Sequence, residues 1–300
     1  MQTNINKIPG KKKNRFLKAF VAFLIGAAAF FLLVYAYDVN SSRTQAYKES
    51  EKIINEFIAK QLNKDPNELT AEDFDRLETL SIKGSEIRTI KPLKKLKNLN
   101  ALGLSMLQIS DTKPLAELEN LKTLQLANFR LRDREPPKWI TKLRTILRLP
   151  TGSISETKPI DLSPLKKLTK LEFLDIRNTD VRNIEILSEF HNLQHLAISK
   201  KNAPDMGIRQ VQKIRTLDLK PIKGLTKLNY LELFGMPVND IQPLVGLSDL
   251  KYLDLTYTEI KDIEPLFKLK NLEYLGLRGT PAIEQIDKLQ KELPNLKIAK

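Results

Sequence analysis

One spacing recurs through most of the chain and constrains its fold more than any other feature. The triplet Leu-x-Leu or Leu-x-Ile begins in three series, each with steps of 22 residues, at Leu80, Leu102 and Leu124, at Leu174 and Leu196, and at Leu231, Leu253 and Leu275. A proline before an apolar residue keeps the same period, at Pro92, Pro114 and Pro136 and again at Pro221, Pro243 and Pro265. Two independent markers that share one period predict a repeat protein.

Within each period the apolar residues follow the pattern L-x-x-L-x-x-L-x-x-L-x-L, which is clearest from Leu266 to Leu277. The final alternation is typical of a short strand that points both leucines to one side. The evenly spaced leucines before it favour a tight helical or 3₁₀ segment, and proline suits the start of such a segment because no amide donor is needed there. One repeat cannot bury its leucines alone, so neighbouring repeats must stack and share a core.

This pattern resembles the leucine-rich repeat family, specifically the 22-residue class of bacterial internalin-like proteins. The resemblance covers about residues 65–300, and LKYLDLTYTEIKDIEPLFKLKNL at 250–272 matches the consensus almost position for position. It implies the α/β fold class, as a curved leucine-rich repeat solenoid with a parallel sheet on its concave face. The sequence departs from the family at the turn position usually given to Asn, which is occupied by Ser85, Thr179, Thr258 or Thr280.

We count nine repeats between two caps. The fourth repeat, near residues 146–149, is out of register, and extra residues lengthen the repeats at about 150–160 and 200–213. Before the repeats, a helical stripe of apolar residues runs through 45–62, and Thr70 reads as the N-cap of a second helix. Internalin-like proteins carry a comparable helical cap. At the other end, residues 293–298 predict a final strand that closes the stack.

The N-terminus reads as a membrane signal. Residues 1–18 contain six basic residues and no acid, and residues 19–37 form an uncharged apolar stretch. A helix of that length spans about 28 Å, close to the thickness of the bilayer hydrocarbon. The positive-inside rule then places the N-terminus in the cytoplasm and the rest of the chain outside. A cleaved signal peptide is the alternative, but the apolar stretch exceeds the usual length of its core.

The candidate binding site lies on the outward face of the predicted sheet, where equivalent residues of successive repeats line up in columns across the strands. The residue before each strand leucine is aromatic-type in five successive repeats: Phe173, His195, Tyr230, Tyr252 and Tyr274. Beside this column lie Asp175, Glu232 and Asp254, with Arg177 and Arg278 in the next one. Parallel neighbours would stack the five rings about 4.8 Å apart. Protein interfaces are enriched in such aromatic residues and arginine. Tyrosines that merely pack against one another are an equally good interpretation.

Catalysis is a poor interpretation of these residues. The chain has no cysteine and two histidines, which excludes disulfides, thiolate zinc sites and cysteine nucleophiles. His195 and Asp175 are diagonal neighbours on an open sheet, and Ser199 lies too far from His195 to act as its nucleophile. Glu232 and Asp254 are too few for a calcium or magnesium site and read as solvated interface acids. His191 reads as a partly buried packing residue. We therefore assign no catalytic, metal or cofactor-binding residues.

The formal net charge of +14 raises nucleic acid or an anionic membrane as partners. The six positive charges of residues 1–18 are a topology signal, and a chain outside the cytoplasm is not expected to meet nucleic acid. The remaining local excess lies in 130–148, with seven basic residues, Asp133, Glu135 and the lone Trp139. That segment either contacts phosphates, lipid headgroups or an acidic partner, or simply solvates the surface, and we favour the second interpretation.

These observations divide the chain into a basic cytoplasmic tail at 1–18, a transmembrane signal-anchor helix at 19–37, a linker with a helical cap at 38–78, and the solenoid with its C-terminal cap at 79–300. The predicted function is protein or peptide recognition by a non-enzymatic, single-pass protein of the cytoplasmic membrane. A structural, envelope-organising solenoid without a specific ligand is the alternative.

Overall fold

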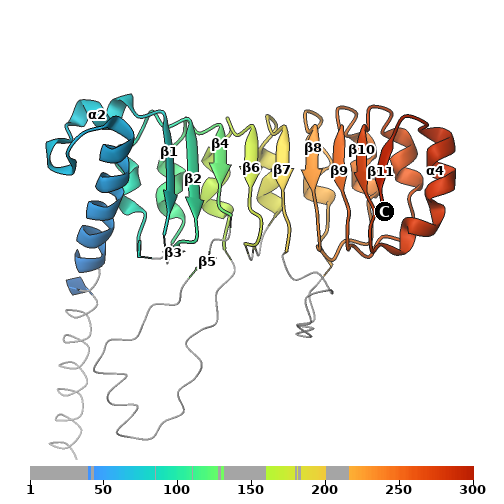
Figure 1. Cartoon of the computed structure of the whole chain (residues 1–300), viewed down its shortest axis with the longest axis horizontal. Coiled ribbons are helices and arrows are strands. Elements are labelled where there is room, and N and C mark those ends of the chain that lie inside the picture. The colour runs from blue at the N-terminus through green and yellow to red at the C-terminus, as the bar shows by residue number, and fades with distance from the viewer. Residues whose placement is uncertain are drawn as a thin grey trace, which may run out of the picture. The chain divides into compact units, whose positions relative to one another are not determined.

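The computed structural model in Figure 1 describes residues 40–41, 44–84, 86–109, 111–127, 130–131, 160–179, 181, 184–200 and 216–300. The predicted tail at 1–18, the membrane segment at 19–37, Ser85, Pro136 and nearly all of 130–148 lie outside these residues. Contacts divide the chain into two units, Tyr47–Arg134 with Ser153–Lys300 and Met1–Ala46 with Glu135–Gly152. The described residues of the second unit, 40–41 and 44–46, are helical. No helix in the described ranges is long and apolar enough to cross a bilayer.

The first unit is built on a nine-stranded sheet whose neighbouring strands are all parallel. The strands stand side by side in chain order in Figure 1. They are β1 (Thr79–Lys83), β2 (Ala101–Ser105), β4 (Thr123–Gln125), β6 (Phe173–Asp175), β7 (His195–Ala197), β8 (Tyr230–Glu232), β9 (Tyr252–Asp254), β10 (Tyr274–Gly276) and β11 (Lys297–Ala299). Every strand predicted from a Leu-x-Leu or Leu-x-Ile triplet is present, which confirms the 22-residue register.

The prediction for the fourth repeat is wrong. We expected its strand, near 146–149, to lie in the sheet between the strands that contain Leu124 and Leu174. Instead β4 pairs directly with β6, with Leu124 opposite Leu174. The Leu126 amide donates to the Asp175 carbonyl at 2.7 Å, and the Glu172 amide donates to the Lys122 carbonyl at 2.8 Å. Because these groups are already paired with each other, the sheet has no place for another strand there.

A second, two-stranded parallel sheet joins β3 (Gln108–Ile109) to β5 (Arg130–Leu131). Arg130 and Leu131 thus begin the predicted basic segment as a strand. Gln108 lies opposite Arg130 and Ile109 opposite Leu131, and Ile109 is fully buried. Strand β3 follows β2 and strand β5 follows β4, so these two neighbouring repeats stay in register beyond the main sheet.

A short 3₁₀ helix precedes most of the strands and lies behind the sheet in Figure 1. These are η2 (Lys91–Lys95), η3 (Lys113–Glu117), η4 (Ser163–Lys167), η5 (Glu185–Glu189), η7 (Lys220–Ile222), η8 (Gln242–Gly246) and η9 (Glu264–Lys268). The prolines at 92, 114, 221, 243 and 265 occupy the first turns, as the sequence predicts. An aspartate two residues before several of these helices caps them; Asp262, for example, accepts the Glu264 amide at 2.9 Å.

The periodic leucines form one continuous core. Leu266, Leu269, Leu275 and Leu277 are all completely buried, and equivalent residues of the other repeats are buried with them. Three of the predicted turn threonines, at 179, 258 and 280, are also buried. Their hydroxyls donate to backbone carbonyls, as Thr258 does to Leu255 at 2.6 Å. A hydroxyl therefore satisfies, in these repeats, a carbonyl that would otherwise be left unpaired in the core.

Helices close the N-terminal end of the core. Residues 44–62 are helical, and their stripe packs inward as predicted, with Ile54 and Ile58 only 1% exposed. Ser50 of this helix is buried and accepts the amides of Arg88 and Thr89 at 3.1 and 3.2 Å. After η1 (Pro66–Glu68), α2 (Ala71–Arg76) begins with a capping box between Thr70 and Asp73, which confirms the predicted N-cap.

The C-terminal end is closed by η10 (Pro281–Gln285), α4 (Ile286–Glu292) and β11. Leu289 of α4 is fully buried, and Leu293 and Leu296 are at most 7% exposed. Strand β11 extends the sheet beyond β10, with Ile298 opposite Leu275. The closing strand predicted within 293–298 is therefore confirmed, displaced by a few residues toward the C-terminus.

Candidate binding face of the sheet

Five stacked rings cross the outward face of the sheet, one from each of the strands β6 to β10. Parallel pairing places Phe173, His195, Tyr230, Tyr252 and Tyr274 opposite one another in turn. The distances between consecutive ring centroids are 4.0, 3.9, 4.2 and 4.6 Å, and the interplanar angles are 12°, 11°, 4° and 3°. We call these five residues the aromatic ladder. The structure confirms the members that the sequence predicted, and the rings lie closer together than the predicted strand spacing of about 4.8 Å.

The ladder rings are half-buried because each ring covers the face of the next. Offset and edge-to-face contacts are the usual arrangements of aromatic pairs, and stacked pairs add about 0.5–1.5 kcal/mol beyond their buried area. The ladder is thus a rigid row, and its ring edges and hydroxyl groups are the parts turned toward solvent. The order of the residues makes its β6 end apolar and its β10 end polar.

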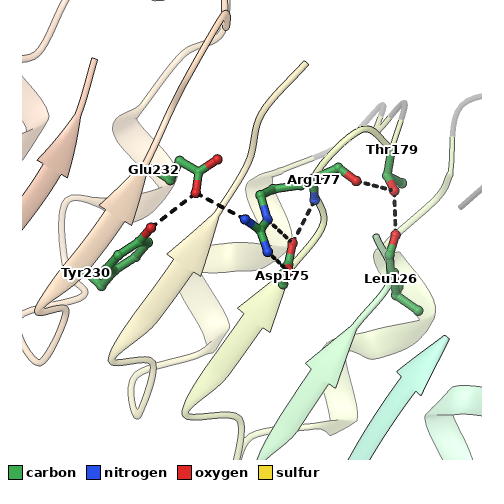
Figure 2. Close-up of polar contacts among 6 residues, drawn as sticks. All are labelled: Leu126, Asp175, Arg177, Thr179, Tyr230 and Glu232. Atoms are coloured by element: carbon green, nitrogen blue, oxygen red, sulfur yellow. Dashed lines mark hydrogen bonds and ion pairs between the residues drawn. The ribbon is translucent and has the colours of Figure 1, made fainter. Parts of the chain in front are cut away.

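Beside the ladder, an arginine joins two acids from different strands, as Figure 2 shows. The Arg177 guanidinium donates from Nε to Oδ1 of Asp175 at 3.0 Å and from Nη2 to Oδ2 at 2.7 Å. Its Nη1 lies 3.7 Å from Oε2 of Glu232, which also accepts the Tyr230 hydroxyl at 3.2 Å. The chain Asp175, Arg177, Glu232 and Tyr230 therefore links β6 to β8 and reaches the ladder.

This chain of contacts passes over β7. The third residues of strands β6 to β10 are register partners and form a row beside the ladder, which we call the middle column: Asp175, Ala197, Glu232, Asp254 and Gly276. Register places Ala197 between Asp175 and Glu232, and its side chain is 1% exposed. A methyl group leaves room for the guanidinium to span two strands, which a larger residue in the same column would block. The pairing raises the pKa of Arg177, chiefly through its hydrogen bonds with Asp175, so the guanidinium is charged at every accessible pH.

Asp175, which the sequence assigns to the candidate binding face, is almost completely covered in the structure. Its side chain is only 2% exposed, whereas that of Arg177 is 45% exposed. Both Asp175 oxygens face the guanidinium, and Oδ1 also accepts the Arg177 amide at 3.0 Å. A carboxylate held this way fixes the arginine and does not itself meet a partner. Arg177, which the outward column already contained, takes its place as the exposed group.

Asp254 is held by a similar local bond, since its Oδ1 accepts the Thr256 amide at 2.9 Å. Its carboxylate leans toward β10, where the register partner is Gly276. A Cβ at position 276 would lie 2.4 Å from Asp254 Oδ1 and 2.8 Å from Thr256 Oγ1. Gly276 is therefore the residue that allows Asp254 to adopt this position. Glu232 leans the other way, toward Arg177 on the far side of Ala197.

Arg278 stands at the end of this face, exposed as predicted. Its guanidinium carbon lies 5.9 Å from the ring centre of Tyr257, and that ring meets Phe234 edge-on with centroids 5.5 Å apart. Tyr257 has a left-handed backbone (φ 55°), and a Cβ on Gly279 would lie within 2.3 Å of its ring. This second aromatic group, which the sequence did not suggest, positions Arg278 at the turn after β10.

Burial keeps the one basic ring of the ladder, His195, uncharged. It lowers the pKa of His195 to about 4, with the Asp175 charge acting in the opposite direction, so the imidazole is uncharged at neutral pH. Burial also raises the pKa of Tyr230 and of Tyr252, with Glu232 and Asp254 adding to the effect in turn. The ring edges therefore present neutral donors and acceptors, and the formal charges lie in the columns beside them.

The structure also places the other polar residues that were weighed in the sequence. No cluster of three or more histidine, aspartate or glutamate side chains suited to a metal ion occurs within the described ranges. Ser199 is buried, at 6% exposure. His191 is exposed, so its prediction as a partly buried packing residue is wrong: it lies in the turn after η5 and not against the core.

Comparisons with known proteins agree with this architecture. A family model described as "Leucine Rich repeats (2 copies)" matches residues 248–291. The internalin InlF of Listeria monocytogenes is similar in structure, with a TM-score of 0.59 and 24% identity over 83% of this chain and 64% of that one. Internalin C2 of the same species gives a TM-score of 0.55 and 23% identity, over 82% and 92% respectively. No curated protein matches in sequence.

The chain thus contains leucine-rich repeats and shares the fold of the internalins. It spans slightly less than two thirds of the InlF structure, and at these identities the likeness concerns the fold alone.

Proposed function

We propose that this protein is a non-enzymatic recognition protein that binds a protein or peptide through the face formed by strands β6 to β10. The observation that carries the proposal is the aromatic ladder, a rigid row of five half-buried rings flanked by Arg177, Glu232 and Asp254. Protein interfaces concentrate their binding energy in such aromatic and arginine residues. Rings that are already ordered also lose little conformational entropy when a partner docks.

The proposal includes the location of this face. Residues 19–37 anchor the chain in the cytoplasmic membrane as a single-pass helix, with the N-terminus in the cytoplasm and the solenoid outside. The support is the uncharged length of that stretch and the six basic residues before it. Protease added to intact spheroplasts is expected to digest the solenoid and spare the tail. Full protection of the solenoid would contradict this orientation.

A capture experiment tests the binding face. The full chain in detergent is used to capture partners from a solubilised envelope fraction, in parallel with the variant Tyr230→Ala, Tyr252→Ala, Tyr274→Ala. We expect the enriched polypeptides to disappear with the triple variant, provided its circular dichroism remains that of the parent. The variant Lys268→Ala, Lys270→Ala alters exposed residues in and after η9 and is expected to retain capture. Equal capture by all three proteins would contradict the proposal.

A second candidate function rests on the same stacking. Because the ring faces are covered by one another, the ladder stabilises the sheet whether or not a partner is present. A structural spacer of the envelope would need nothing more. Under that function, capture with the parent chain enriches no polypeptide over a detergent control, and the triple tyrosine variant changes stability alone.

A further inference from the structure

The ladder restricts the chemistry of its partner, because both faces of its three inner rings, those of His195, Tyr230 and Tyr252, are covered by neighbouring rings. Centroid separations of 3.9–4.6 Å leave no space between successive rings, and the planes are within 12° of parallel. Stacking on a sugar ring and contact with a cation both need an open ring face. The partner therefore meets ring edges, which carry partial positive charge, and tyrosine hydroxyls. Carbonyl oxygens, which recur along any polypeptide, are the natural acceptors for such a row.

The charges beside the ladder differ in sign from the chain as a whole. The outward positions of β7, β8 and β9 are His195, Ala197, Tyr230, Glu232, Tyr252 and Asp254. The two carboxylates are the charged groups of this set, since His195 is neutral. Asp175 and Arg177 form an ion pair at the end of β6, with the guanidinium as its exposed member, and Arg278 lies against the Tyr257 ring at the turn after β10. A chain with a net charge of +14 thus presents a locally negative surface at the centre of the ladder face.

The carboxylates of Glu232 and Asp254 are both partly accessible to a partner, but their existing contacts differ. The Glu232 side chain is 13% exposed, and its contact with Arg177 is the longest in the network, at 3.7 Å. Asp254 is held through Oδ1 by the Thr256 amide and is partly exposed. The two residues are register partners on adjacent strands, and they lean apart toward the small residues Ala197 and Gly276. The two carboxylates therefore flank one point of the sheet face, where a cationic side chain can pair with either of them.

We propose that the partner is a polypeptide segment that places a lysine or arginine side chain at Glu232 and Asp254 while its backbone crosses the edges of the ladder. This rests on the proposed function and specifies the partner's chemistry. Charge complementarity favours a cationic residue at this point, and desolvation by the adjacent rings strengthens the attraction. A polyanion meets the wrong sign of charge, and a neutral glycan finds no open ring face on the three inner rings.

A display selection tests the proposal. The full chain, purified in detergent, is used to select from a library of random 15-residue peptides, and the enriched peptides are measured against four proteins. These are the parent, the ladder variant Tyr230→Ala, Tyr252→Ala, Tyr274→Ala, the acid variant Glu232→Gln, Asp254→Asn, and the control Glu172→Gln, Glu273→Gln. The control removes two carboxylates that directly precede the outer ladder strands β6 and β10, where they pair with Lys122 and Lys251 at 3.3 and 3.1 Å. Both acid substitutions change the net charge equally.

We expect the enriched peptides to contain at least one lysine or arginine and to bind the acid variant at least tenfold more weakly. They should also lose binding with the ladder variant, measured at a temperature at which its circular dichroism matches that of the parent. The control variant should change their affinity less than threefold, since general electrostatic attraction is altered to the same extent in both. Ladder-dependent peptides that bind the acid variant and the control equally would overturn this inference and leave the proposed function standing. A selection without any ladder-dependent peptide would overturn both, as would retention of an immobilised glycan at the ladder.

Discussion

Arg177 and Asp175 are joined by two side-chain hydrogen bonds, of 3.0 and 2.7 Å, between a half-exposed guanidinium and a carboxylate that is almost fully buried. The two residues are two positions apart on one strand edge, so the arginine folds back over its own strand. Glu232 then approaches the outer side of the same guanidinium from β8. The arginine is thereby fixed before any partner arrives, at the end of the ladder where Phe173 and His195 stack.

Arg177→Met should destabilise the protein, because it leaves the Asp175 carboxylate buried without its ion pair. We expect a loss of about 1–2 kcal/mol, below the value for a fully buried pair because the guanidinium is partly solvated. Adding Asp175→Asn should recover part of this loss. Urea unfolding of the two single variants and the double variant measures the coupling. Strict additivity of the two changes would show that the pair makes no specific contribution.

The pH dependence of stability should carry a contribution from His195. Burial lowers the pKa of His195 to about 4 from an ordinary value of 6.5, so between those values the unfolded chain binds a proton that the folded chain does not. The free energy of unfolding therefore falls as the pH drops through this window. His195→Phe keeps a stacked ring and should show a shallower fall from pH 7 to pH 5. An NMR titration of His195 with a midpoint near 6.5 would contradict this account.

Gly276→Ala tests whether the open middle column positions Asp254. The added methyl group overlaps Asp254 Oδ1 and Thr256 Oγ1, so the carboxylate must turn away from the Thr256 amide. Losing that hydrogen bond should cost about 1 kcal/mol. Gly224→Ala is the matched control, since a Cβ there meets no atom within 4 Å. Thermal unfolding compares the two, and equal midpoints would show that Asp254 relaxes without loss.

Tyr252 separates the structural role of the ladder from its role in binding. Tyr252→Phe retains both stacking contacts, of 4.2 and 4.6 Å, and should leave the unfolding midpoint almost unchanged. Tyr252→Ala removes a ring from the middle of the row and should cost about 2–4 kcal/mol, from the lost apolar burial and the two stacked pairs. Calorimetry or urea unfolding measures both. A loss below about 0.5 kcal/mol for the alanine variant would show that the rings do not stabilise one another.

Much of the fold was accessible from the sequence because repeat proteins express one local pattern many times. The spacing of Leu80, Leu102 and Leu124 fixed the strands, and parallel pairing then aligned Phe173 with His195 and Tyr230 without further information. Ring stacking followed from that alignment. A period of this kind predicts columns of residues, and the aromatic ladder is one such column.

Two features of the structure, the pairing of β4 with β6 and the burial of Asp175, depend on contacts that the repeat period does not predict. Residues near 146–149 contain leucines at plausible spacing, yet β6 pairs with β4 and takes the position that their strand was expected to fill. Similarly, alternation places Asp175 on the outward face but does not show that Arg177 covers it. The burial of Asp175 results from the Arg177 side chain, in the turn that follows β6, and Ala197 is what lets that side chain extend to Glu232.

Site-specific photocrosslinking in living cells tests the binding role of the ladder most directly. A photoreactive p-benzoylphenylalanine is placed at Tyr252, in the centre of the ladder, and in a second strain at Lys268, which is exposed on η9. The account predicts a discrete polypeptide adduct of the full chain after irradiation with the residue at 252, absent with the residue at 268. Adducts of the same size and yield from both positions, or none from 252, would contradict recognition through this face.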